Sequence, residues 1–263
     1  MFKKFLSTSL LLALFIPLSF CEIIEIKEMK EAAKYITDDT LVIFDIDNTL
    51  MEPEQTLGND QWFRHRVRVH QLAGLPKTEA INVAVGEWMS VQCITKMQLA
   101  EPGIDHFIKN LQEKNQPVMG LTTRGVGMAT QTIRQLNDLN VQLFSTAPYQ
   151  HDYLFENSHS VLYRNGILFT ANTHKGDALT KLLDHIKFTP KHIVFINDKH
   201  DHITPVQSAC ETLKIPFVGL RYGYLDHKVE GFDSDVADYQ FERFRYILSD
   251  SEAERILAQA NIE

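Results

Sequence analysis

Short apolar runs alternate with longer amphipathic segments along most of this 263-residue chain. An unbroken apolar run fits a strand that is buried on both faces, as strands are in parallel sheets. The runs expected to form strands are Leu41–Ile46, Pro117–Leu121, Val141–Phe144, His192–Ile196 and Pro216–Leu220. Because helical segments separate these runs, the sequence predicts an α/β fold, with helices on both faces of a parallel sheet.

The segments between the apolar runs carry helical periodicity. Helices are expected over Glu25–Ile36, most of residues 60–99 with a break at Gly74-Leu75-Pro76, Ile104–Glu113, Met128–Leu139, Lys175–Ile186, Val206–Leu213 and most of Ala237–Ala260. Within Ser160–Thr170, Asn165-Gly166 indicates a hairpin, which we interpret as a small insertion. Right-handed crossovers place the carboxyl ends of parallel strands at one edge, where ligands bind.

The first residues have the layout of a secretory signal peptide. Lys3 and Lys4 form a charged start and Leu10–Ile16 an apolar centre, which is shorter than the ~20 residues of a transmembrane helix. Residues 1–21 are therefore predicted to be a signal peptide, cleaved after Cys21. The protein is expected in the periplasm or secreted, without a stable membrane span; a retained anchor and a lipoprotein acylated at Cys21 remain as alternatives.

Charge and cysteine content exclude several classes of protein. The chain has 34 acidic and 26 basic residues, a net charge of −8, which becomes −10 once Lys3 and Lys4 leave with the signal peptide. An acidic chain without a basic run is not expected to bind nucleic acid. Three cysteines do not make a disulfide framework. Cys93 and Cys210 are expected to be separately buried thiols, with a disulfide between them as the alternative.

Two aspartates end the first apolar run. Asp45 and Asp47 stand two positions apart, so in an extended chain they point to the same side. Two carboxylates so placed repel each other unless a cation lies between them or one is protonated. Oxygen ligands of this kind suit Mg²⁺. The alternative is a turn or helix cap, because Asp-Asn-Thr favours turns.

Polar residues also follow three later elements. Thr122-Thr123-Arg124 ends the second run, where a hydroxyl and the N–H groups of a turn can hold phosphate oxygens; a helix cap is the alternative. Lys175 is expected in the first turn of a helix whose N-cap is Thr173. The Lys175 side chain either binds an anion there or is exposed to solvent. Asn197-Asp198 ends the fourth run, and Asp198 can complete an oxygen cage with the first two aspartates.

In order and content, these four motifs resemble the haloacid dehalogenase (HAD) superfamily of phosphohydrolases, over Leu41 to about Asp201. That family has a strand ending DxDxT, a strand ending in Thr or Ser, a lysine at a helix start and a strand ending in acids. The signal peptide, Asp60-Gln61-Trp62 and Asn197-Asp198-Lys199 look like uncharacterised exported HAD-like proteins of intracellular Gram-negative bacteria. The resemblance implies a HAD-like, Rossmannoid sheet.

The resemblance also implies a chemical role for each matching residue. Asp45 would be the nucleophile that forms an aspartyl-phosphate, and Asp47 the general acid and base. Mg²⁺ would be bound by Asp45, by the backbone carbonyl of Asp47 and by Asp198. Lys175 and Thr122 would bind the phosphoryl group, and the acid at position 47 favours hydrolysis or transfer of phosphate esters over dehalogenation.

Other positions are secondary candidates under the same resemblance. Thr49 would brace the loop after the first strand. The last motif departs from the family pattern, because Asn197 precedes Asp198 and the next acid, Asp201, comes three positions later instead of four. Asn197 is expected to offer its side-chain carbonyl to the metal, and Asp201 is retained as a further candidate ligand.

About fifty residues separate the first two motifs, and in this family such an insertion resembles a helical cap. Residues 51–100 are therefore predicted to form the cap, and residues 22–50 with 101–263 the core domain. Trp62 and Trp88 lie in the insertion, where packing between cap and core is expected more than a substrate pocket.

The predicted function is a Mg²⁺-dependent phosphatase that cleaves a small phosphomonoester. A HAD-fold binding protein or secreted effector without turnover is one alternative, and a phosphotransferase or phosphomutase is another. A small phosphorylated substrate is the expected partner. The sequence indicates neither its identity nor the oligomeric state.

Overall fold

The computed structural model of this chain describes residues 21–244 and 248–260. The predicted signal peptide over residues 1–21 lies outside the described residues except for Cys21, which begins the first strand. None of the helices within these two ranges has both the length and the apolar character needed to cross a membrane.

The described residues form a mostly parallel sheet of eight strands. Its order is β1-β10-β9-β2-β5-β8-β7-β6. The strands are β1 (Cys21–Ile26), β2 (Thr40–Phe44), β5 (Val118–Thr122), β6 (Tyr153–Glu156), β7 (Ser160–Arg164), β8 (Ile167–Phe169), β9 (His192–Asn197) and β10 (Phe217–Tyr222). In this spatial order, each strand from β1 through β10, β9, β2 and β5 to β8 runs parallel to the next. Strands β7 and β6 are antiparallel additions at the edge beyond β8. The predicted α/β class is confirmed.

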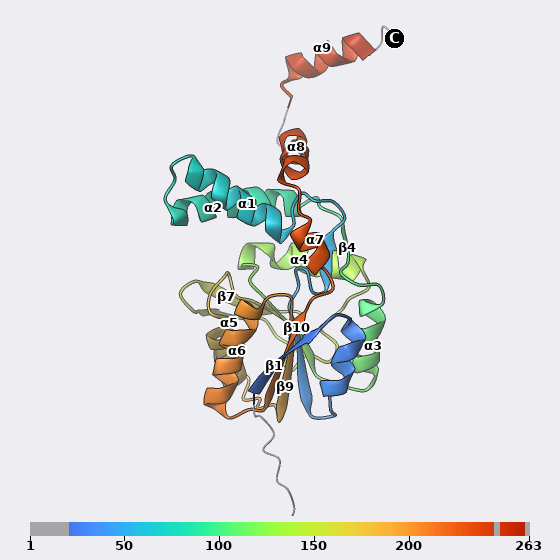
Figure 1. Cartoon of the computed structure of the whole chain (residues 1–263), viewed down its shortest axis with the longest axis vertical. Coiled ribbons are helices and arrows are strands. Elements are labelled where there is room, and N and C mark those ends of the chain that lie inside the picture. Colours follow the sequence, from blue (N-terminus) through green and yellow to red (C-terminus); the bar gives the residue numbers. More distant parts are fainter. Residues whose placement is uncertain (1–20, 245–247, 261–263) are drawn as a thin grey trace, which may run out of the picture.

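Helices cover both faces of this sheet (Figure 1). One face packs against the 3₁₀ helix Met29–Tyr35, α3 (Ile104–Glu113) and α4 (Ala129–Asp138). The opposite face packs against α5 (Lys175–His185) and α6 (His200–Leu213). The remaining helices are α1 (Asp60–Leu72), α2 (Lys77–Gln92), a 3₁₀ turn at Val126–Met128, α7 (Asp226–Glu230), α8 (Ser234–Phe244) and α9 (Asp250–Ala260).

The central strand β2 shows why continuously apolar runs become strands here. Leu41 and Ile43 point into the core beneath α5 and α6, whereas Val42 and Phe44 point into the core on the other face. All four side chains are fully buried. Apolar residues are needed at consecutive positions because successive side chains of a strand face opposite layers.

Between β2 and β5 the chain forms a helical hairpin with a small sheet at its base. The antiparallel strands β3 (Met51–Pro53) and β4 (Met97–Leu99) flank the helices α1 and α2, which pack on each other. Figure 1 shows this pair above the main sheet, beside α8. Trp62 on α1 is fully buried, and its ring centroid lies 5.0 Å from that of Phe241 on α8. The segment after β10 therefore packs against the residues inserted between the first two motifs.

The helix predicted over Glu25–Ile36 is wrong in its first part. Residues Cys21–Ile26 form the edge strand β1, which pairs in parallel with β10, and only Met29–Tyr35 is helical. An isoleucine-rich segment fits either state by periodicity. The open edge of β10 decides between them, because it supplies hydrogen-bond partners to a strand.

The strand predicted at Val141–Phe144 does not form. Val141 and Leu143 are buried, but the place beside β5 is taken by β8. The predicted hairpin at Asn165-Gly166 is confirmed as β7–β8, although it belongs to the main sheet and is no separate insertion. Apolar composition indicated the burial of Val141 and Leu143 correctly, but β5 pairs with β8 of the hairpin instead of with this segment.

Two smaller predictions also need correction. Helix α6 begins at His200 instead of Val206 and contains Pro205. Cys210 is buried as expected, but Cys93 is exposed at the end of α2, and no disulfide joins these two residues.

Helices α5 and α6 approach closely at a glycine beside the site. A Cβ atom at Gly176 would lie 2.1 Å from the carbonyl oxygen of Pro205. We therefore expect Gly176→Ala to lower the free energy of unfolding in urea by about 1–3 kcal/mol, the usual cost of overpacking. Gly86→Ala is the matched control, because a Cβ there meets nothing within 4 Å. It should stabilise α2 by about 0.5–1 kcal/mol. Equal responses of the two variants would contradict the close approach of α5 and α6.

Candidate active site

The carboxyl ends of β9, β2 and β5 meet at one edge of the sheet, because these neighbouring strands run parallel. Asp45 and Asp47 follow β2, Thr122 ends β5 and Asp198 follows β9. Lys175 joins them as the first residue of α5. The candidate residues predicted from four separate motifs thus occupy one region of the structure.

Asp45 is paired with Lys175 inside the protein. The Lys175 Nζ atom donates a hydrogen bond of 2.9 Å to Asp45 Oδ1, and the two side chains are 3% and 6% exposed. The ammonium group also lies 5.4 Å from the ring centroid of Phe195. Burial lowers the pKa of Lys175, and the Asp45 carboxylate opposes this shift. A cation is therefore held against one oxygen of Asp45 while the other oxygen accepts no hydrogen bond from the described part of the chain.

The cap of α5 differs from the predicted one. His174 is the N-cap residue, and its Nδ1 atom accepts a hydrogen bond of 3.2 Å from the Asp177 N–H. The Thr173 hydroxyl, predicted to be the cap, accepts a hydrogen bond from Asn157 Nδ2 at 3.0 Å. Asn157 comes from the loop before β7, so a tertiary contact decides which residue caps the helix.

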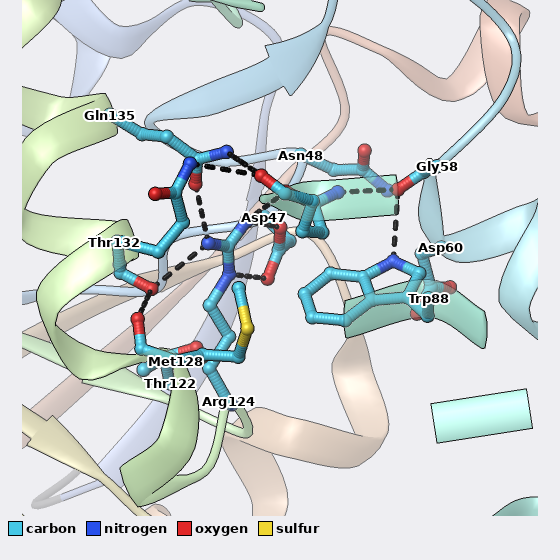
Figure 2. A network of polar contacts seen from close by, with 12 residues as sticks. Asp47, Asn48, Gly58, Asp60, Trp88, Thr122, Arg124, Met128, Thr132 and Gln135 are labelled. Carbon is cyan, nitrogen blue, oxygen red and sulfur yellow. Dashed lines mark hydrogen bonds and ion pairs between the residues drawn. The ribbon is translucent and has the colours of Figure 1, made fainter. Parts of the chain in front are cut away.

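Asp47 is paired with Arg124 in a two-bond fork (Figure 2). Arg124 Nε donates to Asp47 Oδ2 at 2.9 Å, and Nη2 donates to Oδ1 at 2.7 Å. The arginine side chain is 1% exposed and the aspartate side chain 25% exposed. Sequence reasoning missed this pair, because it treated Arg124 only as part of a phosphate-binding turn. The one available signal was an arginine next to a strand end that faces several acids.

Asp198 is connected to the loop after β2 by two hydrogen bonds. Its Oδ2 accepts one from Asn48 Nδ2 at 3.3 Å, and its backbone N–H donates one to Thr49 Oγ1 at 3.2 Å. Asn48 has a left-handed backbone with φ of 58°, which asparagine tolerates in turns. The hydrogen bond to Thr49 therefore ties the loop after β2 to the end of β9.

The second oxygen of Asp198 has no partner. Oδ1 is buried and takes part in no hydrogen bond within the described residues. Burial, together with the Asp45 and Asp60 carboxylates, raises the pKa of Asp198 to about 7, against the opposing effect of Lys199. A buried carboxylate oxygen without a donor is costly, so a cation at this position would stabilise it.

The remaining candidates have less direct roles. Asn197 is fully buried, but its Oδ1 already accepts a hydrogen bond from the Lys199 N–H at 2.8 Å, which opposes the carbonyl-ligand role expected for it. Thr122 Oγ1 accepts a hydrogen bond from the Arg124 N–H at 3.1 Å. Asp201 is exposed on α6, and no hydrogen bond or ion pair between described residues connects it to the other candidates.

The helical hairpin contributes an acid to the same region. Asp60, the first residue of α1, forms an ion pair of 2.7 Å with Lys199. Burial and the charges of Lys175 and Lys199 lower the pKa of the neighbouring His202 to about 3, so this imidazole is neutral near pH 7. A cavity of about 250 Å³ opens here; Asp198 and Lys199 line it, with Arg64 of α1 and Arg221 of β10.

The donor set fits a hard divalent cation such as Mg²⁺. Asp45 and Asp198 are close enough to influence each other electrostatically, and Asp198 Oδ1 lacks a donor. Oxygen ligands are those that Mg²⁺ prefers. Among the described residues, no group of three or more His, Cys, Asp or Glu side chains is placed to hold a metal. Two carboxylates would therefore need backbone, water or substrate oxygens to complete the coordination shell.

Comparisons with known proteins identify relatives along most of the chain. Residues 22–254 match the sequence profile of a family described as "Protein of unknown function (DUF2608)". A "Putative outer membrane protein" of Chlamydia pneumoniae is 26% identical over 240 residues, 90% of each chain. A protein with the same name from Chlamydia trachomatis is 26% identical over 244 residues, 92% of each chain. A haloacid dehalogenase-like hydrolase of Streptococcus pneumoniae has a TM-score of 0.42 at 14% identity, covering 70% of this chain and 95% of that one.

The raised pKa of Asp198 predicts how stability depends on pH in the metal-free protein. A folded-state pKa of about 7 lies above the ordinary value of 3.8, so the folded protein keeps a proton that the unfolded chain releases. The stability that this proton contributes is lost as the pH rises through that window. The prediction concerns the difference in free energy of unfolding between Asp198→Asn and the wild type, measured in EDTA. We expect this difference to shift in favour of Asp198→Asn by more than about 1 kcal/mol as the pH rises from about 5 to about 8.

Urea unfolding at several pH values measures this difference. The contribution of His202 to the pH dependence of stability is present in both proteins, so it cancels from their difference. Asp184→Asn is the control, because the Asp184 side chain is 79% exposed, and it should show no such trend. A stability difference for Asp198→Asn that does not change with pH would contradict the raised pKa.

Proposed function

The chain belongs to the DUF2608 family of proteins of unknown function, and from its site we propose that it is a phosphohydrolase that cleaves a small phosphomonoester through an aspartyl-phosphate on Asp45. The observation that carries the proposal is the buried pair of Asp45 and Lys175, placed beside the unpartnered oxygen of Asp198. The order of the four motifs and their common position at the sheet edge support a HAD-like site.

In this mechanism, Asp45 attacks phosphorus. Lys175 holds Oδ1, which leaves Oδ2 to form the bond to phosphorus while the bond from phosphorus to the ester oxygen breaks. The Lys175 ammonium group offsets negative charge that gathers on the transferring phosphoryl oxygens. A nucleophile of this kind divides hydrolysis into two easier steps.

Asp47 handles the protons in both steps. In the first step it gives a proton to the departing ester oxygen, so that an alcohol leaves. In the second step it takes a proton from the water that attacks phosphorus, and the bond from Asp45 to phosphorus breaks to release phosphate. Thr122, at the end of the neighbouring strand β5, would donate its hydroxyl hydrogen to a phosphoryl oxygen; its Oγ1 atom accepts a hydrogen bond from the Arg124 N–H, which leaves that hydrogen available.

Mg²⁺ is the cofactor that we propose for this site. The carboxylates of Asp45 and Asp198 and the backbone carbonyl of Asp47 would bind it, and it would neutralise charge on the phosphoryl group. Residues 51–100 are proposed as a cap over the 22–50 and 101–263 core. The contacts of Asp60 with Lys199 and of Trp62 with Phe241 support a lid that limits the site to small substrates.

We also propose that the protein is exported. The signal-peptide pattern of residues 1–21 and the outer-membrane names of its chlamydial relatives support this. A second candidate function, ligand binding without turnover, is favoured by the last motif, because Asn197 Oδ1 already accepts a hydrogen bond from the Lys199 N–H and Asp201 is exposed.

We expect the purified protein to release phosphate from para-nitrophenyl phosphate in the presence of Mg²⁺, and EDTA to abolish this activity. Asp45→Asn should lower kcat by about a thousandfold or more, because an amide cannot form the covalent intermediate. The exposed Asp184→Asn is the control and should keep wild-type activity. Absence of turnover in the wild-type protein with several phosphate esters would favour the binding function instead.

Mg²⁺ should also bind without substrate. We expect saturating Mg²⁺ to raise the Tm of the wild-type protein by a few degrees, because a ligand that binds only the folded state stabilises it. Asp198→Asn removes one of two proposed carboxylate ligands and should lose this shift, whereas Asp184→Asn should keep it. Equal shifts in all three proteins, measured by thermal unfolding, would contradict Mg²⁺ binding at Asp198.

A further inference from the structure

Arg124 is a buried cation whose hydrogen-bonding capacity is completely used inside the protein. A guanidinium group has five N–H donors. Two of them bind Asp47, from Nε and Nη2, at 2.9 and 2.7 Å. Nη1 donates to Thr132 Oγ1 at 2.9 Å and to Gln135 Oε1 at 2.8 Å. The second Nη2 donor reaches Gln92 Oε1 at 3.4 Å.

This saturation excludes the role in which Arg124 would bind a phosphate. Each donor already has a protein acceptor, and the side chain is only 1% exposed. A guanidinium group does not lose its proton under ordinary conditions, so Arg124 does not act as an acid or a base either. Its remaining action is on the orientation of the Asp47 carboxylate.

Two helices hold the guanidinium group in place. On α4, Thr132 and Gln135 fix one end (Figure 2). On α2, the Trp88 ring lies against the guanidinium plane, with its centroid 5.0 Å from the Arg124 Cζ atom. The Trp88 indole and the Gln92 amide both donate to the Gly58 carbonyl, at 2.9 and 2.7 Å. The end of α2 is therefore anchored directly beside the fork.

A fork of two parallel hydrogen bonds fixes the plane of a carboxylate as well as its distance. Proton transfer to a leaving oxygen depends on that plane, because the donor must point along the line to the acceptor. Asp47 is 25% exposed, and Arg124 is the donor of both hydrogen bonds that its carboxylate accepts from the described residues.

We propose that Arg124 is a positioning residue that sets the orientation of Asp47 for proton transfer, held in place by Trp88 and Gln92 of the helical insertion. This inference rests on the proposed function, because it assumes that Asp47 protonates the leaving group. Under this proposal, the helical insertion helps to hold Asp47 in its orientation through Arg124, in addition to its proposed role as a lid.

The test compares two esters that differ in their need for an acid. The para-nitrophenolate group leaves without a proton, whereas the alkoxide of ethyl phosphate requires one. The value of kcat/KM includes the steps up to alcohol release and excludes the shared hydrolysis of the aspartyl-phosphate. We expect Arg124→Gln to lower kcat/KM for ethyl phosphate by about a hundredfold, the lower range of general acid catalysis, and that for para-nitrophenyl phosphate by less than about tenfold.

A double-mutant cycle shows whether Arg124 acts through Asp47. In an Asp47→Asn background, we expect Arg124→Gln to change kcat/KM for ethyl phosphate by less than about threefold, because the group that it orients is gone. Effects that multiply independently would contradict the inference. Absence of turnover in the wild-type protein would contradict the proposed function and the inference together, whereas turnover with independent effects would contradict the inference alone.

Two further variants separate orientation from charge and from folding. Arg124→Lys keeps the positive charge but not the fork, and it should retain the selective loss on ethyl phosphate; full rescue by lysine would contradict an effect through orientation. If Arg124→Gln does not fold, the lysine variant carries the comparison. Arg66→Gln is the matched control, because Arg66 binds Glu87 through a fork of 2.8 and 2.9 Å and lies over the Phe241 ring. It should change both substrates equally.

Discussion

Three carboxylates gathered at a poorly hydrated edge of the sheet are the constraint on which the rest of this site depends. Parallel neighbouring strands bring their carboxyl ends together, so acids that end β2 and β9 must lie close to one another. Negative charges that lie close together at a buried edge repel one another, which raises the free-energy cost of burying each of them. Each acid is matched by a different neighbour: Lys175 for Asp45, Arg124 for Asp47 and Asn48 for Asp198. Within the described residues, Asp198 Oδ1 is buried without a hydrogen-bond donor.

The same charge matching connects the sheet edge to the helices above it. Lys199 reaches Asp60 on α1, and the Arg124 guanidinium lies against Trp88 on α2. Packing supplies a second connection, because Trp62 of the insertion is buried against Phe241 of α8. The helical hairpin is therefore held by an ion pair and a cation–π contact near the site and by an apolar contact with the segment that follows the last strand.

Four of the eight strands of the main sheet, β2, β5, β9 and β10, could be predicted from apolar runs, because a strand buried on both faces leaves no room for polar residues. The errors have a common physical cause. Val141 and Leu143 are buried without being part of a strand, and Cys21–Ile26 is a strand that resembles the start of a helix. Apolar composition reports burial, whereas a strand also requires a neighbour with free backbone groups. That neighbour is β10 for β1, and beside β5 the place belongs to β8.

Spacing along the chain was enough to locate the acids, the hydroxyl and the lysine at the ends of their elements, because strand and helix ends are marked by local patterns. It did not assign their partners. Arg124 and Asp47 are separated by 77 positions and Lys175 and Asp45 by 130. Electrostatic pairing falls off with distance in space, and that distance is set only when the crossovers have stacked the strands. The sequence therefore carried the chemistry of the site, while the folded sheet and its helical insertion decided which charge faces which.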